Sequence, residues 1–533
     1  MIKERVKILL LWLGGFLYVL PAYNKYWAPF DEGIIVVAVQ RLLAGEIPYK
    51  DFFMVMYPPG QIYTLGAIFS VFQNPLIVGR IYTVLVSVAI AVLSYSMTRV
   101  LTKNKIVSIF AYVMTLTSLG PRLGTIPAPI WPGVALSLLA LYVFILFLHN
   151  KKTMYVLFSG LACGAAILFR HDLGLSAGLA ISLVLAVGLL WRRGIASLLI
   201  FISGVLVVTL PVIACFVRIG AAKDLYNSLI SFTFVHSKTA VIPFPVPCFD
   251  PNMIFHQSLN FITVNQFYIP VIIYSVVLVI LFARFMKNRN CEGAEDLSVL
   301  ALAIYGILIF KEVYTRADPA HLLMMMAPAT ILSAYIISGA FSRKSKMGAA
   351  SIIKYIVSII LIFLFALLLV KNTDKYLKNG FTKVFKKGII KTGFPGKGTI
   401  YIPKEERAEV LDTINYIKEN TSPKERIYIG NTAHWKDDFG GTLILYYLTD
   451  RLPSTKFYEL LPGLVTDKDV QVEIKNSIML HNVKLIVLQD VATDGLKKED
   501  APKDRLILDE FIERNYVPAA KFGKYNIYKK RGY

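Results

Sequence analysis

Long apolar runs recur along most of this chain, and they constrain its fold more than any other feature. Two of them cover residues 8–23 and 352–370. Each is close to the roughly 20 residues that an α-helix needs to cross a bilayer. Hydrocarbon offers no hydrogen-bond partner, so backbone groups in such a run must be satisfied within the segment. With 56% hydrophobic and 17% charged residues, the sequence predicts an all-α polytopic membrane protein rather than a soluble one.

The net charge of +22 is carried by Lys and Arg residues that gather in short loops between the apolar runs. In a soluble protein this charge would suggest nucleic acid, but we find no basic and aromatic stripe of the kind that binds single strands. Basic residues in short loops instead orient spans, because they stay on the cytoplasmic side. We therefore expect no nucleic-acid partner, and we expect the lipid bilayer, including its anionic headgroups, to attract this charge.

The order of basic clusters and apolar runs predicts about eleven spans, with a cytoplasmic N-terminus and an extracytoplasmic C-terminus. The first span follows a short basic start without a small-residue cleavage site, so we expect it to be retained. Residues 61–72 are apolar but too short to span alone, and we expect a juxtamembrane or re-entrant helix there. The basic run at 371–387 would lie outside, which a long translocated domain allows. The clusters expected inside are at 3–7, 99–105, 151–152, 192–193, 284–289 and 343–346.

The composition changes after Tyr376. We assign residues 1–376 to a transmembrane domain, 377–400 to a polar linker and 401–533 to a small extracytoplasmic α/β domain. Within the last, periodicity predicts helices over 405–420, 469–481 and 504–516, and buried strands over 426–429 and 485–488. Strands that alternate with helices favour a parallel sheet. This domain contains no Gly-rich phosphate loop, and we expect it to rigidify the membrane part.

The four cysteines do not indicate a disulfide framework or a metal site. Cys163 and Cys215 fall in predicted spans, and Cys248 and Cys291 are expected on opposite membrane faces. Two outer segments, at 24–60 and 218–266, are too long to be turns, and long connections tend to be functional or disordered. Residues 239–252 of the second segment are rich in Pro and aromatic residues and could close over a site.

The first candidate site is the Asp31-Glu32-Gly33 run, just beyond the first apolar segment. Adjacent carboxylates can act as a general base or hold a divalent ion through oxygen ligands. The alternative is structural: Asp31 would cap a helix over 34–43, and the helix dipole would favour Glu32 near its start. The two roles are compatible.

Three further runs of polar residues lie at predicted outer tips. They are Tyr-Pro-Pro-Gly at 57–60, Arg-His-Asp at 170–172, and the segment 311–321 with its Lys-Glu and Arg-Ala-Asp-Pro-Ala-His sequences. Ionisable groups at such depths usually face a partner or a water-filled cavity, and cations there could grip a phosphate. The alternative is internal pairing, Arg170 with Asp172, Lys311 with Glu312 and Arg316 with Asp318. The prolines at 58 and 59 set the entry of the next helix.

Other isolated polar residues carry weaker signals. Arg80 and Arg122 are interpreted as interfacial anchors. His236 and His256 are expected to be surface residues of the long loop. His434 lies in the C-terminal domain without a partner that the sequence reveals.

The order of these features resembles the GT-C superfamily of glycosyltransferases, close to the protein mannosyltransferase and aminoarabinose transferase group, family 39-like. The resemblance rests on Asp-Glu-Gly after the first span, an amphipathic helix over 37–43, Leu-Leu-Ala-Gly-Glu-Ile-Pro-Tyr at 42–49, and Tyr-Pro-Pro-Gly at 57–60. The segments at 314–322 and 446–453 are also similar. It covers the membrane portion and is sharpest over 29–60.

The resemblance implies a membrane glycosyltransferase of the cell envelope, in a group that includes protein-glycosylating enzymes. It would move a sugar from a polyprenyl-phosphate carrier to an extracytoplasmic acceptor that the sequence does not identify. Asp31 matches the catalytic carboxylate and Glu32 the second acid of the motif. Tyr57 stands where relatives often have a Lys that holds the lipid phosphate, so Tyr57 is expected in the substrate pocket. Phosphate binding then falls to Arg170, His171, Lys311, Arg316 and His321.

The resemblance leaves open whether a divalent metal ion is required, and any such ion would be held by Asp31 and Glu32. A nucleotide site is not expected, because the donor is lipid-linked. Three alternatives remain at this point: a lipid-linked-sugar flippase or transporter, a ligase or polymerase that also uses polyprenyl carriers, and an inactive structural homologue. Transporters commonly show related halves, which this chain lacks.

Overall fold

The computed structural model describes residues 2–54, 56–72, 75–119, 126–187, 194–236, 241–247, 257, 264–288, 293–340, 349–376, 388–492 and 496–533. Several predicted features lie outside these residues: Arg122, His256, Cys248, Cys291, the basic residues at 192–193, 289 and 343–346, the loop residues 239–240 and 248–252, and residues 377–387 of the predicted linker.

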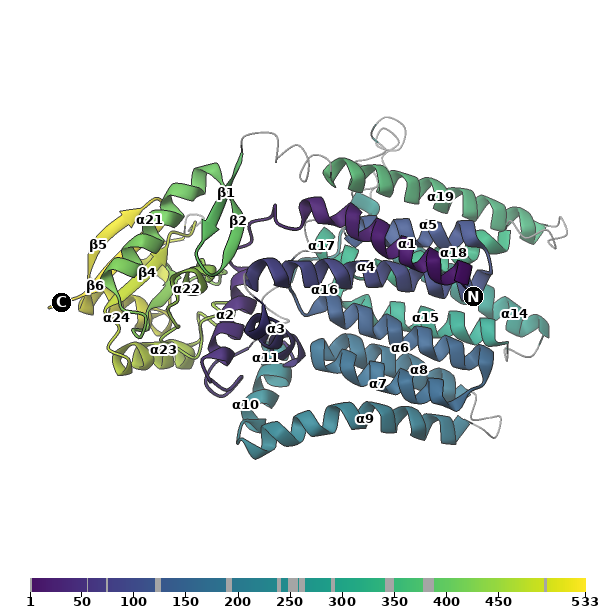
Figure 1. Ribbon diagram of the computed structural model, residues 1–533, viewed down its shortest axis with the longest axis horizontal. Coiled ribbons are helices and arrows are strands. Elements are labelled where there is room, and N and C mark those ends of the chain that lie inside the picture. The colour runs from purple at the N-terminus through teal and green to yellow at the C-terminus, as the bar shows by residue number, and fades with distance from the viewer. Residues whose placement is uncertain are drawn as a thin grey trace.

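A bundle of long helices forms one end of the molecule, and these helices run roughly along its long axis (Figure 1). Apolar runs of bilayer length form helices because only intrahelical hydrogen bonds satisfy their backbone. The bundle helices are α1 (Ile2–Val19), α4 (Pro75–Thr102), α5 (Lys105–Leu119), α6 (Ile130–Asn150), α7 (Thr153–Phe169), α8 (His171–Val187), α9 (Gly194–Arg218), α14 (Tyr268–Asn288), α15 (Ala294–Ile309), α18 (Met326–Ala340) and α19 (Ala349–Tyr376).

Within the described ranges, six helices are long and apolar enough to cross a membrane, and six further apolar helices are shorter. One of the short helices is α3 (Gly60–Val71), where the sequence predicts a juxtamembrane or re-entrant helix. Without α3, these described apolar helices number eleven, which is the predicted number of spans. Which of them cross the membrane stays a prediction.

Shorter elements gather where the bundle meets the C-terminal domain (Figure 1). They are the 3-10 turn η1 (Leu20–Ala22), α2 (Asp31–Leu43), α3, α10 (Ala222–Tyr226), the π-turn η3 (Asn227–Ser231), α11 (Phe232–His236), α16 (Lys311–Thr315) and α17 (Pro319–Met324). Most of them come from the long outer segments and from the predicted outer tip at 311–321.

The described residues of the C-terminal domain form two sheets and four α-helices. A hairpin pairs β1 (Ile389–Phe394) with β2 (Gly398–Pro403). The main sheet has the order β3-β4-β6-β5, with β3 (Tyr428–Asn431), β4 (Leu485–Gln489), β5 (Tyr516–Phe522) and β6 (Tyr525–Lys530). The helices are α21 (Lys404–Asn420), α22 (Ile444–Thr449), α23 (Lys468–Leu480) and α24 (Ile507–Asn515), and two 3-10 turns, η5 (Lys498–Asp500) and η6 (Lys503–Arg505), precede the last.

The predicted fold class, a polytopic helical bundle with a small C-terminal α/β domain, is confirmed, but two details are wrong. Only β3 and β4 are parallel, because a tight turn at Gly523, with φ +55°, folds β5 back onto β6 as an antiparallel hairpin. The predicted linker at 377–400 also contains β1 and the start of β2. Two of its glycines, Gly396 and Gly398, have positive φ at the turn between these strands.

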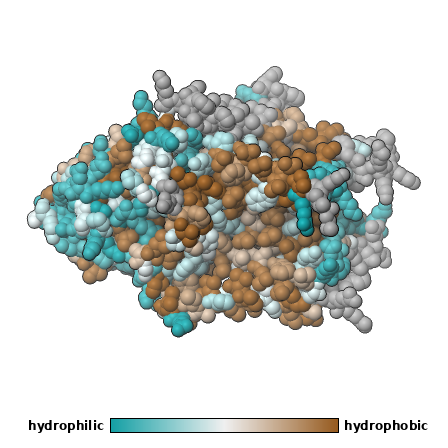
Figure 2. Space-filling model, viewed as in Figure 1, coloured by the Kyte–Doolittle hydropathy of each residue, from teal (hydrophilic) through white to brown (hydrophobic). Residues whose placement is uncertain are grey.

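The surface polarity follows this division. Hydrophobic side chains cover most of the visible bundle, whereas hydrophilic side chains gather over the C-terminal domain and at the far end of the bundle (Figure 2). An apolar belt between two polar ends is the surface that a bilayer-spanning protein requires. The N-terminus lies at the bundle end remote from the C-terminal domain (Figure 1).

One hydrophobic core runs through the junction and includes residues of both parts. It joins Ile34 to Val39 of α2 with Leu443 to Leu448 around α22 and with Ile429 and Val487 of the main sheet. The sequence predicts an amphipathic helix here, but Val36, Val37, Ala38 and Val39 are all fully buried. The reason is that the middle of α2 is enclosed between α3 and α22, so only its two ends, at Asp31 and Leu43, are exposed.

Candidate active site

A cavity of about 800 Å3 lies where the bundle, the outer segments and the C-terminal domain meet. Seven of the eight predicted site residues line it, and they come from four separate parts of the sequence; Glu32 is the exception. This size falls in the range of small-molecule sites. The charged and hydroxyl-bearing residues in the wall are Asp31, Tyr57, Arg170, His171, Asp172, Ser176, Thr233, Lys311, Glu312, Arg316, Asp318, His321 and Glu459.

Asp31 is the first residue of α2 and lies in the cavity wall. The alternative that Asp31 caps a helix over 34–43 is wrong, because α2 already begins at Asp31 and its N-cap is Phe30. The helix start is instead held by the C-terminal domain: Ile444 donates its amide hydrogen to the carbonyl of Pro29 over 3.0 Å. Asp31 therefore sits at the positive end of the helix dipole, which favours its ionised form.

Glu32 points away from the cavity and is buried in an ion pair with Arg80 of α4. Arg80 donates from Nε and Nη2 to the two carboxylate oxygens over 2.7 and 2.5 Å, and from Nη1 to Asn24 over 2.7 Å. Arg80 is only 3% exposed, so its interpretation as an interfacial anchor is wrong. Successive residues of a helix differ by about 100° in direction, which separates the environments of Asp31 and Glu32.

Tyr57 reaches the cavity from the start of the segment that leads into α3. Burial raises the pKa of Tyr57 to about 12; Arg170 opposes the shift, and the carboxylates of Glu459 and Asp31 add to it. Its phenol is therefore neutral at physiological pH and can donate a hydrogen bond. A Cβ on Gly60 would lie 2.5 Å from the carbonyl oxygen of Leu168, so glycine lets α3 begin directly against the end of α7.

Arg170 ends α7 and forms a two-bond ion pair with Asp172 over 2.8 and 2.7 Å. A longer contact of 3.5 Å joins it to Glu312. The expected Arg170–Asp172 pair is therefore present, whereas Glu312 approaches Arg170 rather than its neighbour Lys311. Lys311 lines the cavity, and within the described ranges its ammonium group has no hydrogen bond or ion pair. It is the cation of this cluster most available to an anion.

Asp318 binds the other polar residues of the 316–321 segment in the cavity wall. Its carboxylate accepts bonds from the backbone amides of Ala320 and His321 at the start of α17, pairs with the His321 ring over 2.8 Å and with Arg316 over 3.1 Å. Burial alone would raise the pKa of Asp318, but the bonds from His321 lower it to about 2. The predicted Arg316–Asp318 pair is present, and it orients both Arg316 and His321 along the wall.

Three cavity residues come from the C-terminal domain, and the sequence reasoning missed them. They are Phe439, Glu459 and Leu461. Glu459 is only 1% exposed. None of them lies in a recognisable motif, and each depends on how the domain docks. The only sequence signal is indirect, because the similar segment at 446–453 ends shortly before Glu459.

The residues do not converge on a metal site. In the described part of the chain no three His, Cys, Asp or Glu side chains form a group that could hold a metal ion. The predicted pair of ligands is divided, since Asp31 lines the cavity and Glu32 binds Arg80.

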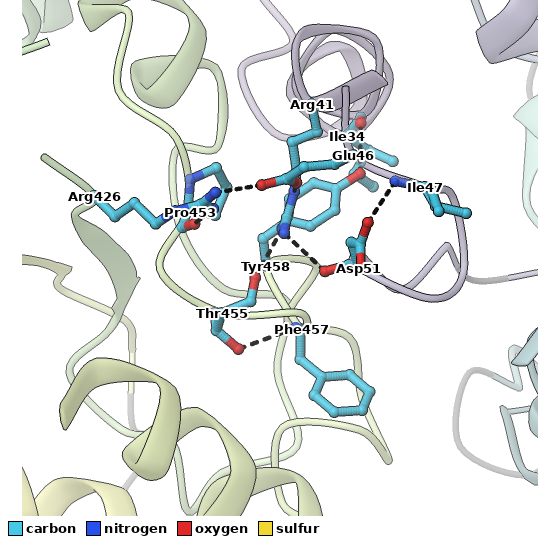
Figure 3. A network of polar contacts seen from close by, with 10 residues as sticks. All are labelled: Ile34, Arg41, Glu46, Ile47, Asp51, Arg426, Pro453, Thr455, Phe457 and Tyr458. Atoms are coloured by element: carbon cyan, nitrogen blue, oxygen red, sulfur yellow. Dashed lines mark hydrogen bonds and ion pairs between the residues drawn. The ribbon is translucent and has the colours of Figure 1, made fainter. Parts of the chain in front are cut away.

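A buried network fixes the C-terminal domain beside α2 (Figure 3). Arg41 forms an ion pair with Glu46 and donates to the carbonyls of Thr455 and Asp51 over 2.7 and 2.9 Å. Glu46 also pairs with Arg426 over 2.5 Å. Two residues from each part of the molecule are thus joined by charge-assisted bonds, which are stronger than neutral ones.

Gly33 explains why the acidic run ends in glycine. A Cβ at this position would lie 2.5 Å from the amide nitrogen of Ile444. Beside it, the Tyr458 hydroxyl donates to the carbonyl of Ile34 over 2.9 Å. The Asp-Glu-Gly run therefore combines a cavity carboxylate, an internal ion pair and a close backbone contact with the C-terminal domain.

Solved structures share this architecture along almost the whole chain. ArnT from Cupriavidus metallidurans, bound to undecaprenyl phosphate, matches with a TM-score of 0.52 at 12% identity, covering 99% of this chain and 97% of that one. The archaeal oligosaccharyltransferase AglB from Archaeoglobus fulgidus matches with a TM-score of 0.53 at 12% identity, covering 99% and 75%. This chain has the GT-C fold.

The sequence comparisons point the same way over a shorter stretch. The family model described as dolichyl-phosphate-mannose-protein mannosyltransferase matches residues 57–217, less than half of this GT-C chain. A comparison with curated proteins found no match. The ArnT apo structure gives a TM-score of 0.51 and covers 99% of this chain, so the likeness of fold does not depend on the lipid.

Proposed function

We propose that this GT-C protein is a membrane glycosyltransferase that moves a sugar from a polyprenyl-phosphate carrier to an extracytoplasmic acceptor. One observation carries the proposal: Asp31 and the cations Arg170, Lys311 and Arg316 line a single cavity at the junction of an apolar bundle and a hydrophilic domain. A lipid-linked phosphate can reach such a site from the bilayer while its sugar faces water. The ArnT structure contains bound undecaprenyl phosphate, and the AglB structure contains a dolichol-phosphate.

The chemistry needs a base and an anion site, and the cavity supplies both. Asp31 takes the proton from an acceptor hydroxyl as its oxygen bonds to the sugar's anomeric carbon, which general-base catalysis speeds by about 10²- to 10⁴-fold. The bond from that carbon to the phosphate oxygen breaks, and the electron pair leaves with the lipid phosphate. Lys311, with Arg170 and Arg316, stabilises the added charge on the phosphate. At the end of the step Asp31 holds the proton, the acceptor holds the sugar, and the lipid phosphate is released.

The orientation in the membrane follows from the same arrangement. The basic N-terminal end of the bundle lies opposite the C-terminal domain (Figure 1). Because basic ends tend to stay in the cytoplasm, this arrangement supports the proposed topology, with the cavity and the C-terminal domain on the extracytoplasmic side. A donor without a nucleotide fits this location.

The first test is a transfer assay with purified full-length protein and membrane extract. The donors are radiolabelled undecaprenyl- and dolichyl-phosphate sugars, and wild type is compared with Asp31→Asn, which keeps the shape but removes the charge. Transfer of label by wild type and its loss in the variant support the proposal. Equal transfer by both would refute the role of Asp31. If wild type moves no label from lipid but carries it across sealed liposomes, the flippase alternative replaces the proposal.

A further inference from the structure

The C-terminal domain contributes a carboxylate to the cavity, although its sequence suggests only a supporting role. Glu459 lines the cavity and is 1% exposed. Burying a carboxylate costs free energy unless polar groups compensate it. Glu459 is therefore the carboxylate that the C-terminal domain brings to the cavity wall.

Glu459 is held firmly by the residues on both sides of it. Phe53 donates its amide hydrogen to the carbonyl of Lys456 over 3.0 Å, and the adjacent Tyr458 donates its hydroxyl to the carbonyl of Ile34 over 2.9 Å. On the other side Leu460 accepts a backbone bond from Gly440 over 3.0 Å. Because Ile34 lies one helical turn after Asp31, the two carboxylates are set relative to each other by a short and rigid path.

Phe439 directly precedes Gly440, whose amide bonds to Leu460 next to Glu459. Phe439 supplies an aromatic ring at this point. The side chain of Phe439 is 39% exposed. Its ring packs edge-to-face against Phe30 with centroids 5.7 Å apart, and the Arg316 guanidinium lies 5.9 Å from its centre. Phe30 directly precedes Asp31, so Phe439 lies between the proposed base and one of the proposed phosphate-binding cations.

That position is where the sugar ring of a lipid-linked donor must lie. The ring is bonded to the phosphate on one side and receives the acceptor oxygen on the other, so it occupies the space between the cations and Asp31. A carboxylate accepts strong hydrogen bonds from hydroxyl groups, and an aromatic ring offers a large apolar face for the C–H side of a sugar. Glu459 and Phe439 provide this combination.

We propose that Glu459 and Phe439 of the C-terminal domain form the subsite for the transferred sugar, with Glu459 accepting hydrogen bonds from its hydroxyl groups and Phe439 packing against its ring. The inference rests on the proposed glycosyltransferase function and deepens it. Glu459 is a specificity-determining residue in this scheme, and Asp31 remains the base.

The test compares Glu459→Gln and Phe439→Leu with wild type in the donor panel used above. Glu510→Gln is the matched control, because the Glu510 side chain is 44% exposed in the same domain and pairs only with Arg514 among the described residues. We expect Glu459→Gln to raise the KM for the sugar donor roughly 10- to 100-fold, the usual effect of losing hydrogen bonds to a charged group. Phe439→Leu should raise it by a smaller factor, and both variants should change the ranking of the donors.

Inhibition by undecaprenyl phosphate without a sugar separates this role from a structural one. We expect its inhibition constant to be unchanged in both variants, since the lipid phosphate does not touch the subsite. An equal weakening of lipid phosphate and sugar donor would overturn the inference. So would an unchanged donor KM, or a rise in the KM for the acceptor alone, which would assign Glu459 to acceptor hydroxyls. Should Glu459→Gln fail to fold, Phe439→Leu decides by the same criteria. Absence of transfer by wild type would refute the proposed function itself.

Discussion

Asp31 and Glu32 are adjacent acids that serve different purposes. The helix directs Asp31 into the cavity and Glu32 into a buried pair with Arg80. Removing one partner of a buried pair leaves the other charge uncompensated, which costs much more than the pair contributes. The sequence motif alone does not distinguish the two acids, because the difference lies in what α4 and the C-terminal domain place beside each.

The two acids can therefore be separated by stability. We expect Glu32→Gln to lower the free energy of unfolding by roughly 3 kcal/mol, because Arg80 loses its buried counter-charge. Asp31→Asn should leave the unfolding temperature within a few degrees of wild type and abolish transfer. Thermal unfolding in detergent, followed by tryptophan fluorescence, measures the first effect. Equal unfolding temperatures for Glu32→Gln and wild type would contradict the structural role.

Lys311 is the cation with the fewest competing partners among the described cavity residues. We expect Lys311→Met to weaken inhibition by undecaprenyl phosphate by about tenfold, the effect of one charge-assisted contact, and Lys311→Arg to retain most of it. Lys424→Met, at an exposed position of the C-terminal domain, is the control. Unchanged inhibition in Lys311→Met would assign the phosphate to the arginines instead.

The stability of the folded protein should depend on pH through Asp318, and it should fall in acid. Its pKa of about 2 in the folded protein is below the ordinary value of about 3.9. The stabilisation by its contacts is therefore complete above about pH 4 and is lost as the pH falls towards 2. Asp318→Asn should lack this acid-dependent component. Unfolding temperatures of both proteins between pH 5 and pH 2 test this, and parallel curves would refute it.

At the scale of elements, α2 decides how the two parts of the molecule meet. It packs against α3 on one side and α22 on the other, and its carbonyl at Ile34 and its residue Arg41 both bond to the segment before Glu459. The similar sequence at 446–453 includes the end of α22, so two motifs that the resemblance singled out lie on opposite sides of one interface. Both motifs therefore contribute to the contact between the two parts of the molecule, in addition to any role in the chemistry.

The close contact at Gly33 makes this interface sensitive to a single methyl group. We expect Gly33→Ala to lower the unfolding temperature and the transfer rate together, although alanine favours a helix, because its Cβ would lie 2.5 Å from the Ile444 nitrogen. Gly14→Ala in α1 is the control, since nothing lies within 4 Å of a Cβ there. Limited proteolysis should cut Gly33→Ala faster than either wild type or the control. Equal cutting of all three would show that the interface tolerates the methyl group.

At the scale of the whole molecule, the candidate active-site cavity is shared by the membrane part and the C-terminal domain. The predicted division into a catalytic domain and a supporting one therefore does not describe the cavity, whose wall includes Phe439, Glu459 and Leu461. The apolar belt between two polar ends (Figure 2) sets the cavity near the polar end that bears this domain. A lipid-linked donor and a water-borne acceptor can meet there.

The proposed orientation is tested by labelling single cysteines in intact cells. In a background with the four native cysteines replaced by Ser, Glu513→Cys in the C-terminal domain should react with a membrane-impermeant maleimide. Lys105→Cys, at the start of α5, should react only after the cells are opened. Both positions are exposed. The reverse pattern would invert the topology and place the cavity in the cytoplasm.

The sequence by itself determined the fold class and the helices over 405–420 and 469–481, and seven of the eight site residues that it predicted line the cavity. These depend on local properties: apolar length, 3.6-residue periodicity, and charges where apolar runs end. Only the tertiary structure decided that Glu32 pairs with Arg80, that Glu312 approaches Arg170, and that Glu459 enters the cavity. Each of these depends on segments far apart in the chain, brought together by the packing of α2 against α22, and no local pattern records such a contact.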